Sequence, residues 1–344
     1  MSGRVLVTGG AGFIGSHIAE AFLAGGWEVT VLDDLSRGHE RNVPRGARFV
    51  CADIRSPEAR RLVVDGRFEV LNHHAAQIDV RVSVDRPAYD AEINLVGFVN
   101  LLEGAGEGGV KRVVFASSGG VVYGETDVFP TPETDAKRPV SPYGVSKLAG
   151  EHYLHALGML RGFEGVAMRY SNVFGPRQDP KSEAGVVSIF VSRVLERRPM
   201  TIFGDGKQTR DYVFVRDVAR ANVLASRATL PSADGIDGAA FNIATAREHT
   251  VLDVAEAVMG VMRARVPLEF APPWPPDAPS DRPRMPASML LAKPCASGEM
   301  FARNAPSSTP PEFAAVAEAT WTWLSSSPLY RTMTPMVVGA GTPE

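Results

Sequence analysis

The chain has 344 residues, of which 44% are hydrophobic and 22% charged, with a formal net charge of -3. This balance suits a globular protein with a full-sized core in one large domain or two lobes, and it argues against broad electrostatic binding to nucleic acid or membrane. Two cysteines, Cys51 and Cys295, are too few for a disulfide framework or a multi-cysteine zinc site. Because no secretory signal or membrane-spanning window is recognisable, we expect a cytoplasmic protein without metal, nucleic-acid or membrane partners.

Short apolar runs alternate with helical patterns in the first half of the chain. Strands are predicted at residues 4–8, 28–32, 48–51, 70–72 and 112–116, and helices at 13–24, 91–102 and 143–157. Strands that alternate with helices of this length are typical of βαβ units. The sequence therefore predicts an α/β fold with a parallel sheet covered by helices on both faces.

The second half is less regular. Helical patterns occupy 186–197 and 251–262, and a strand-like apolar run covers 240–244. Residues 271–311 hold 11 of the 26 prolines, so an irregular stretch is expected there. A helical pattern resumes at 312–324, before a tail that we expect to be disordered.

A glycine-rich motif lies at the seam between the first strand and the first helix, with Gly9, Gly12 and Gly15 at its fixed positions. Glycines there let the backbone approach a pyrophosphate, which sits on the free N–H groups of the helix N-terminus. Asp33, eighteen residues after Gly15, can accept hydrogen bonds from both ribose hydroxyls and repels a 2′-phosphate. The motif therefore favours NAD over NADP, whereas the alternative is a glycine turn that holds no ligand.

Two further motifs suggest proton chemistry. Tyr143 and Lys147 are four residues apart, so on a helix they share a face, and the ammonium should lower the phenol pKa from its usual ~10. That makes Tyr143 a candidate general base. Ser117 and Ser118 end a predicted strand, and since adjacent strand residues face opposite ways, only one should point at a substrate. Serines at a strand end are also common turn formers.

The order of these motifs is similar to that of a known family. The segments that carry the resemblance are Gly9–Gly15, His73–Gln77, Asn94, Ser117–Ser118, Tyr143–Lys147, Arg169–Arg177, Gly204–Gly206, Gln208–Val213, Asp217–Ala219 and Phe241–Ile243. Over residues 1–270 the chain resembles the extended short-chain dehydrogenase/reductases of the NAD-dependent epimerase/dehydratase type, and within them the UDP-glucose 4-epimerases. The resemblance implies a Rossmann-type doubly wound sheet with a smaller α/β substrate-binding lobe.

The resemblance also implies a role for each matching residue. The cofactor NAD would be bound by Gly9, Gly12, Phe13, Ile14, Gly15, Asp33, Asp53, Ile54, Ala75, Ala76, Asn94, Ser117, Tyr143, Lys147 and Tyr170. Catalysis would use Ser118, Tyr143 and Lys147. The nucleotide-sugar substrate would contact Ser118 and Tyr143 through its sugar, and Asn172 and Arg210 through its diphosphate. For Arg210 the alternative is a solvated surface ion pair.

Glycines at 119 and 120 help to choose the reaction. Dehydratases and decarboxylases of this fold carry acidic residues just after the catalytic hydroxyl residue, whereas Gly119 and Gly120 have no group that could protonate a leaving hydroxyl. This favours an epimerase that inverts C4 of a UDP-hexose through a 4-keto intermediate. A 4,6-dehydratase, a 4-ketoreductase and a non-catalytic dinucleotide-binding regulator remain as alternatives. By analogy, helices 91–102 and 143–157 would pair two subunits as a homodimer.

The domain expectation follows the same resemblance. Residues 1–170 would bind NAD with 211–246 folded back onto them, 171–210 and 247–324 would bind the nucleotide sugar, and 325–344 would be a tail. Residues 271–277 read Ala-Pro-Pro-Trp-Pro-Pro-Asp where the family usually has an Arg-Pro-Gly-Asp-like segment. We therefore hypothesise compensating frameshifts across 271–311, which leave the identity of the sugar open.

Overall fold

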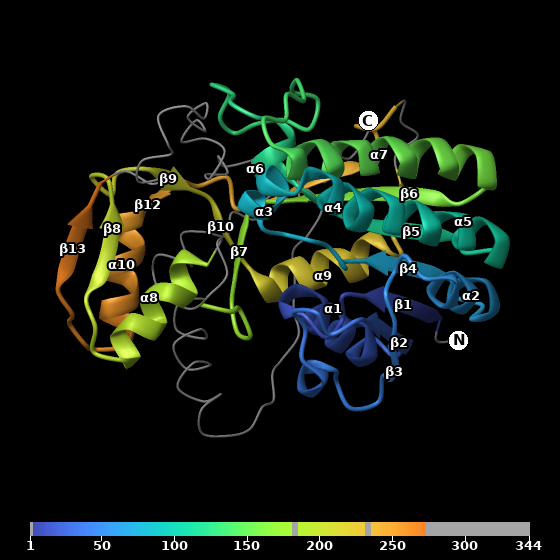
Figure 1. The fold of residues 1–344 in the computed structure, drawn as a ribbon, viewed down its shortest axis with the longest axis horizontal. Helices are drawn as coiled ribbons and strands as arrows, with labels where there is room; N and C mark the ends of the chain where they lie inside the picture. The colour runs from blue at the N-terminus through green and yellow to red at the C-terminus, as the bar shows by residue number, and fades with distance from the viewer. Residues whose placement is uncertain (1–2, 181–184, 231–234, 273–344) are drawn as a thin grey trace, which may run out of the picture.

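The computed structural model describes residues 3–180, 185–230 and 235–272. Its main feature is a seven-stranded parallel sheet with the strand order β11-β6-β5-β4-β1-β2-β3 (Figure 1). The strands are β1 (Arg4–Thr8), β2 (Glu28–Asp33), β3 (Arg48–Cys51), β4 (Val70–His73), β5 (Arg112–Ser118), β6 (Glu164–Tyr170) and β11 (Ala240–Ile243). The predicted α/β fold of the Rossmann type is confirmed.

Helices cover both faces of this sheet. The set comprises α1 (Phe13–Ala24), α2 (Pro57–Asp65), α3 (Val80–Asp85), α4 (Pro87–Ala91), α5 (Phe98–Gly108), α6 (Gly119–Val122), α7 (Pro142–Arg161) and α9 (Val215–Ala225), with a short 3-10 turn η1 (Glu40–Asn42) and a π-helical segment η2 (Glu92–Gly97). In Figure 1, α1 and α9 lie against one face, whereas α2, α5 and α7 lie against the other.

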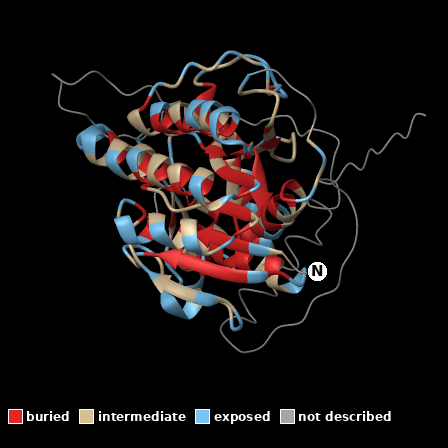
Figure 2. Cartoon of the chain, turned by 90° about the vertical axis from the view of Figure 1, so that its right-hand side faces the viewer, coloured by how far each residue is buried: buried red, intermediate tan, exposed pale blue. Residues whose placement is uncertain are grey.

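Alternation along β1 explains the two layers. Val5 and Val7 pack in the core beneath α1 and α9, and Leu6 packs in the core beneath α2, α5 and α7. All three side chains are fully buried, as expected for a parallel strand with helices on both sides. Figure 2 shows the result, with buried residues in the sheet and exposed residues on the outer faces of the helices.

The order in which successive strands join the sheet reverses between β1 and β4. From β1 the chain continues outward to β2 and β3, then crosses back so that β4, β5 and β6 follow on the other side. In sheets of this kind ligands bind beyond the carboxyl ends of the strands at such a reversal. The glycine turn after β1 and the loop after β4 meet there.

A second, smaller group of elements follows β6. It contains β7 (Asn172–Phe174), β8 (Met200–Phe203), β9 (Thr209–Arg210), β10 (Tyr212–Phe214), β12 (His249–Thr250), β13 (Leu268–Ala271), α8 (Val186–Leu195) and α10 (Val251–Val261). These strands form three two-stranded pairs, β10–β7, β12–β9 and β13–β8. A third apolar core lies there and includes Phe190, Met200, Ile202, Ala255 and Val258.

Most element boundaries agree with the sequence, and the differences have local causes. Helix α7 starts at Pro142 because Ser141 caps it, with Oγ accepting from Gly144 N at 3.1 Å, and it runs on to Arg161, where Gly162 adopts φ 80°. Where one helix was predicted at 91–102, the chain forms α4, the π-helical η2 and α5 in succession. Strand β13 reaches into the segment that was expected to be irregular.

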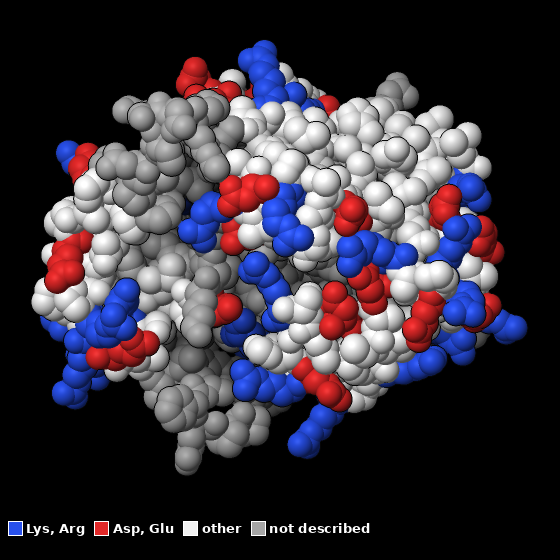
Figure 3. Space-filling view, in the orientation of Figure 1, with Lys and Arg blue, Asp and Glu red and all other residues white. Residues whose placement is uncertain are grey.

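Several expectations fall outside the described residues. They are the terminal helix at 312–324, the tail at 325–344, nearly all of the atypical segment at 271–311, and Cys295. Within the described ranges, none of the helices combines the length and apolar character required to cross a membrane. Cys51 is exposed and unpaired. Basic and acidic side chains are interspersed over the face drawn in Figure 3.

Candidate active site

The three motif glycines have different geometric tasks. Gly9 adopts φ 68°, and a Cβ there would lie 2.6 Å from Ala75 N. A Cβ on Gly15 would lie 2.7 Å from the carbonyl carbon of Gly9 and closer still to its oxygen. Among the described residues, a Cβ on Gly12 would meet Gly9 O alone, at 3.1 Å. Gly9 and Gly15 therefore close the turn, whereas Gly12 borders open space.

That open space lies at the N-terminus of α1. Gly12 is the N-cap of the helix and has no side chain to bond the first N–H groups, and the first intrahelical bond runs from Ser16 N to Gly12 O at 3.3 Å. The N–H groups of Phe13 and Ile14 are thus left without intrahelical partners, as at any helix start. This cradle fits a pyrophosphate.

Asp33 ends β2 and is held against the same turn. Its Oδ2 accepts from Ala11 N at 3.0 Å and its Oδ1 from Leu35 N at 2.9 Å. Burial raises the pKa of Asp33, and the two backbone bonds act against that rise. The structure thus brings Asp33 together with the glycine motif, where a ribose would lie beside the bound pyrophosphate.

Asp53 and Ile54 follow β3. Asp53 pairs with Arg55 at 2.5 Å, and the hydrogen bonds from Arg55 lower the pKa of this carboxyl. Ile54 is buried, and its carbonyl accepts from Asn100 Nδ2 at 2.8 Å. The loop is therefore fixed from two sides at the carboxyl edge of the sheet, next to β2.

The loop after β4 carries Ala75 and Ala76 and is anchored to β1. Thr8 Oγ1 accepts from Ala75 N at 3.2 Å and from His74 N at 3.1 Å. We call residues 74–79 the β4 loop. Its position places the two alanines opposite the glycine turn, since Ala75 N would be the nearest neighbour of a Cβ on Gly9.

Asn94 supports this loop from η2. Its Oδ1 accepts from Gln77 N at 2.9 Å, while its Nδ2 donates to Gln77 O and to Asp90 Oδ1, both at 2.9 Å. Both amide hydrogens are therefore used inside the protein, and the side chain is only 2% exposed. The Asn94 side chain thus supports the β4 loop from beneath, and the contact of this residue with the cofactor stays a prediction.

Tyr143 and Lys147 share one face of α7, as predicted. Lys147 is buried, its Nζ donates to Ala116 O at 2.9 Å, and it lies 5.6 Å from the centroid of the Tyr143 ring. Burial lowers the pKa of Lys147 to about 8, although Asp90 and Glu151 act in the opposite direction. The ammonium is thus tied to β5 just before the two serines.

The predicted pKa shift of Tyr143 is wrong for the empty site. Burial raises the pKa of this phenol, and the Asp90 carboxylate raises it further. The helical spacing reveals only the neighbour four residues along α7, whereas Asp90 comes from a helix that packs across α7. In the ligand-free protein these two effects favour the protonated phenol.

The two serines face opposite ways. Ser117 is buried and its Oγ donates a short hydrogen bond to Glu151 Oε1. Ser118 is half-buried at the strand end. The hydroxyl of Ser117 therefore points into the protein rather than toward a cofactor, so only the backbone of this residue could line one.

Glu151 belongs to a buried network that the sequence analysis did not identify. Arg169 Nη2 lies 2.6 Å from Glu151 Oε2 and 2.8 Å from Asp237 Oδ1, and its Nη1 donates to Tyr123 at 2.9 Å. Glu151 lies four residues beyond Lys147, so the helical spacing could have revealed it. The network fixes α7 against β5 and β6.

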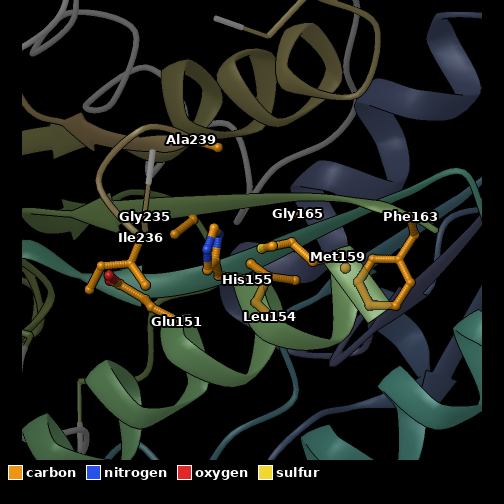
Figure 4. A pocket seen from close by; sticks show the side chains of 11 residues that line it. Glu151, Leu154, His155, Met159, Phe163, Gly165, Gly235, Ile236 and Ala239 are labelled. Carbon is orange, nitrogen blue, oxygen red and sulfur yellow. The ribbon is translucent and has the colours of Figure 1, made fainter. Parts of the chain in front are cut away.

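A cavity of about 110 Å³ lies on the outer side of this network (Figure 4). Its lining comes from the second half of α7, including Leu154 and Met159, from β6, from Phe163 between these two elements and from the segment before β11, with Glu151 at one end. None of the predicted site residues lines it. The cavity is thus separate from the proposed catalytic pair.

Tyr170 ends β6 and is fixed by polar partners. His74 Nε2 lies 2.8 Å from its hydroxyl, and Asn222 Nδ2 donates to the same oxygen at 2.7 Å. Burial lowers the pKa of His74 to about 3, so this imidazole is neutral. Tyr170 is one of the residues predicted to bind NAD, whereas the two residues that orient its hydroxyl have no signal in the local sequence.

The predicted diphosphate residues lie in the second group of elements. Asn172 Nδ2 donates to Asp211 O at 3.0 Å. Arg210 is 7% exposed, its Nη1 donates to Thr209 O, and its Nη2 is buried without a hydrogen-bond partner among the described residues. Burial lowers its pKa to about 10. The alternative of a solvated ion pair therefore does not hold: in the described part of the chain, this guanidinium has no carboxylate at ion-pair distance.

Metal chemistry was not expected. Within residues 3–180, 185–230 and 235–272, no three His, Cys, Asp or Glu side chains are grouped so that they could hold a metal ion.

Comparison with known proteins identifies the family to which the chain is similar. Residues 5–244 match the model of the NAD dependent epimerase/dehydratase family. A UDP-glucose 4-epimerase of Mycolicibacterium smegmatis is 44% identical over 275 residues, which span 78% of this chain and 86% of that protein. The UDP-glucose 4-epimerase of Thermotoga maritima, solved with UDP-glucose, matches with TM-score 0.74 and 42% identity over 79% of this chain and 86% of that one. The Thermus thermophilus UDP-glucose 4-epimerase, solved with NAD, matches with TM-score 0.75 and 44% identity over 86% and 90%.

Proposed function

The chain belongs to the NAD dependent epimerase/dehydratase family, and on that premise we propose that it is an NAD-dependent isomerase that inverts C4 of a UDP-hexose through a transient 4-keto sugar. The UDP-glucose/UDP-galactose pair is the proposed substrate, since the most similar proteins described above are UDP-glucose 4-epimerases. An epimerase of this pair would serve galactose metabolism.

The observation that carries the proposal is the arrangement at the end of β5. Lys147 donates a hydrogen bond to Ala116 O, and Tyr143 lies on the same face of α7 as Lys147. Ser118 lies two residues after Ala116, at the end of β5. Gly119 and Gly120 come next in α6 and bear no acid. The site therefore has a base and a hydroxyl for oxidation at a carbinol carbon, but no acid at this position to expel water.

The residues present fit NAD. At Gly12 the helix N-terminus has no side chain, so a pyrophosphate could approach the backbone there. Asp33 is held beside this position by its hydrogen bond from Ala11 N. Bound NAD would supply a hydride acceptor and a positively charged nicotinamide ring. A positive charge beside Tyr143 would favour the phenolate and offset the effects of burial and of Asp90.

The protein's own groups then have separate tasks. Tyr143 takes the proton of the sugar 4-hydroxyl and later returns it, while the Lys147 ammonium stabilises the phenolate. Ser118 holds the same sugar oxygen by a hydrogen bond. Arg210 binds the substrate diphosphate, for which its Nη2, unpartnered among the described residues, is suited. Asn172, the second proposed diphosphate residue, lies in β7, which pairs with β10.

The domain division is proposed on the core structure. Residues 1–170 with 211–246 would bind NAD, because β11 extends the main sheet beside β6. The lobe formed by 171–210 and by the described part of 247–324 would bind the nucleotide sugar, because it has a core of its own around Met200 and Val258.

We also propose a cytoplasmic homodimer. Val96 in η2 and Val145 and Tyr153 in α7 are 58%, 53% and 44% exposed, respectively, so these helices present apolar side chains to solvent. Pairing them in a four-helix contact would bury these side chains. Light scattering at micromolar concentration should give a dimer mass, and a monomer mass would contradict the pairing. The reduced, exposed Cys51 suits the cytoplasm.

The activity is tested with purified protein and a panel of nucleotide sugars, with 4-epimers separated by chromatography. UDP-glucose should yield UDP-galactose without added NAD(P)H. Tyr143→Phe should abolish turnover while NAD stays bound, and near-normal epimerisation by this variant would remove Tyr143 from its role. Stoichiometric NAD(P)H consumption would indicate a 4-ketoreductase, loss of water from the sugar a dehydratase, and NAD binding without turnover a regulator.

A further inference from the structure

Asp90 in α4 is a fully buried carboxylate that joins three parts of the site. Its Oδ1 accepts from Gln77 Nε2 at 3.0 Å and from Asn94 Nδ2 at 2.9 Å, and its Oδ2 accepts from Ser146 Oγ at 2.7 Å. Gln77 belongs to the β4 loop, Asn94 to η2, and Ser146 to α7. One side chain thus links the loop proposed to contact the cofactor to the helix that carries the catalytic pair.

The β4 loop depends on this link. Gln77 Nε2 also donates to Asp79 O at 2.8 Å, and Gln77 Oε1 accepts from Asp79 N at 2.7 Å, so the amide clamps the turn of the loop. Asp79 then caps α3 by accepting from Arg81 N and Val82 N. The amide of Gln77 is itself held in place by Asp90 Oδ1.

The charge of Asp90 is not required for these hydrogen bonds. An asparagine at position 90 could accept from Gln77 and Asn94 through its Oδ1 and donate to Ser146 Oγ through its Nδ2. All three observed bonds are donated to the carboxylate by neutral groups, and across the described residues Asp90 has no ion pair. Since an unpaired buried carboxylate destabilises a fold, the charge needs another explanation.

The catalytic pair provides one. Ser146 lies between Tyr143 and Lys147 in α7, so Asp90 reaches the helix at the level of both side chains. Its negative charge raises the pKa of Tyr143, and it raises the pKa of Lys147 against the lowering caused by burial. Asp90 therefore helps to keep the Lys147 ammonium charged in a buried place.

The other ionisable groups around the pair are compensated or neutral. Glu151, one turn beyond Lys147, is paired with Arg169. His73 and His74, at the end of β4, are held neutral because burial lowers the pKa of both.

Asp79, the N-cap of α3, lies 3.7 Å from Arg81 and pairs with it, and on η2 Glu92 pairs with Arg55. Asp85, at the end of α3, is exposed, as is Arg86, which lies over the ring of Tyr89. Strand β5 and helix α6 bring no ionisable side chain to this end of α7. Among the described groups that face the catalytic pair, Asp90 is thus the negative charge without a cation of its own.

We propose that Asp90 is a positioning residue of the reaction, which locks the β4 loop to the catalytic helix and whose buried charge sets the pH range in which Tyr143 and Lys147 work. This assignment rests on the proposed epimerase function for its effect on turnover. Its effects on loop geometry and on the titration of Lys147 are independent of which reaction the site performs.

The test compares Asp90→Asn, which removes the charge and keeps the bonds, with the matched control Asp65→Asn, which neutralises an exposed carboxylate at the end of α2. Because the negative charge is removed, both the acidic and the basic limb of the pH–rate profile of Asp90→Asn should move to lower pH by about 0.5–1 unit. The control should match the wild type. A profile for Asp90→Asn that differs from the wild type only in height would overturn the electrostatic role.

A second readout needs no turnover. The chain has six lysines, and NMR of protein with 13C-labelled lysine follows the titration of Lys147 directly, with Lys147→Met to assign its signal. The midpoint should fall by about 0.5–1 unit in Asp90→Asn and stay constant in Asp65→Asn. If the Lys147 midpoint moves in Asp90→Asn while the wild-type protein epimerises no sugar, the proposed reaction fails and the electrostatic role of Asp90 stands. If the Lys147 midpoint does not move, the electrostatic role of Asp90 is overturned.

The loop part is tested by NAD retention. Asp90→Ala removes all three acceptor contacts, and after gel filtration it should retain several-fold less NAD than Asp90→Asn. Melting curves of both variants establish that they fold. If Asp90→Ala does not fold, Gln77→Ala, which releases only the loop, takes its place with the same expected loss. Wild-type retention of NAD by the folded variant would overturn the proposed lock.

Discussion

Alanine substitutions at two glycines of one turn, Gly12 and Gly15, should have opposite consequences. At Gly15 the new Cβ would lie 2.7 Å from the carbonyl carbon of Gly9 and 3.0 Å from Gly10 Cα. Gly9 cannot retreat freely, since its N–H donates to Leu32 O at 2.8 Å and its carbonyl accepts from Gly12 N at 3.0 Å. Relief of the overlap would disrupt both bonds.

The free-energy cost at Gly15 follows from these contacts. Two hydrogen bonds contribute about 1 kcal/mol each, and overpacking adds about 1–3 kcal/mol, so Gly15→Ala should lower the free energy of unfolding by about 3–5 kcal/mol. At about 2–4 °C per kcal/mol for a domain of this size, Tm should fall by about 6–20 °C.

Gly12→Ala should leave the empty protein nearly as stable as wild type. The backbone at Gly12 has φ -83° and ψ -175°, which any residue adopts, and the new methyl group would meet only Gly9 O at 3.1 Å. Reduced entropy of the unfolded chain favours alanine by about 0.4–1 kcal/mol, while alanine is a poorer N-cap by a similar amount. The methyl group would instead occupy the cradle and weaken NAD binding at least about tenfold, or 1.4 kcal/mol.

The assay measures both properties on the same samples. Protein stripped of NAD is unfolded thermally, and NAD is titrated by calorimetry into each folded variant. Wild-type NAD affinity in Gly12→Ala would refute the placement of the pyrophosphate at this residue. A Gly15→Ala protein with wild-type Tm would refute the assigned division of tasks between the glycines.

Three further variants follow from the charges in the structure. Arg210→Met should preserve or raise Tm of the empty protein, because it removes a buried guanidinium without an acid partner, and calorimetry should show UDP bound at least about tenfold more weakly. Lys147 has a pKa of about 8 in the folded protein and 10.5 in the unfolded chain, so between these pH values the unfolded chain binds more protons. The free energy of unfolding of the NAD-free protein should therefore rise by about 3 kcal/mol between pH 8 and pH 10.5. Denaturation of Lys147→Met should not show this rise. Arg169→Met should cost about 3–5 kcal/mol in urea unfolding because Glu151 is left buried and unpaired, and a second change, Glu151→Leu, should restore part of the loss.

The sequence predicts the sheet well because its strands are short, apolar and separated by helices. It also locates the glycine turn and the pair Tyr143 and Lys147, since both depend on local spacing alone. It does not tell Gly12 from Gly15, because that difference depends on how near the Gly9 carbonyl lies to each. Nor does it predict the π-helical η2, since no local pattern distinguishes this segment from the α-helix around it.

Side-chain roles that depend on contacts across the fold are less predictable. Alternation along β5 requires that one serine points inward, but only the position of Glu151 in α7 shows that it is Ser117. Similarly, Asn94 fits the spacing of a cofactor contact, yet its amide is occupied by Gln77 and Asp90. The raised pKa of Tyr143 has the same origin, because Asp90 lies 53 residues away in the chain.

Buried charges in this protein divide into two kinds. Arg169 and Glu151 compensate each other in the interior, so their charges are accounted for by the fold alone. Within the part of the chain that the structure describes, Arg210, Lys147 and Asp90 are buried without an ion pair, and each borders a proposed ligand or the pair that acts on it. An isolated buried charge weakens the empty fold, and an anionic diphosphate at Arg210 would relieve that penalty. The unpartnered guanidinium of Arg210 therefore marks the proposed diphosphate site better than charge density does, whereas the opposite charges of Lys147 and Asp90 act on each other within the described residues.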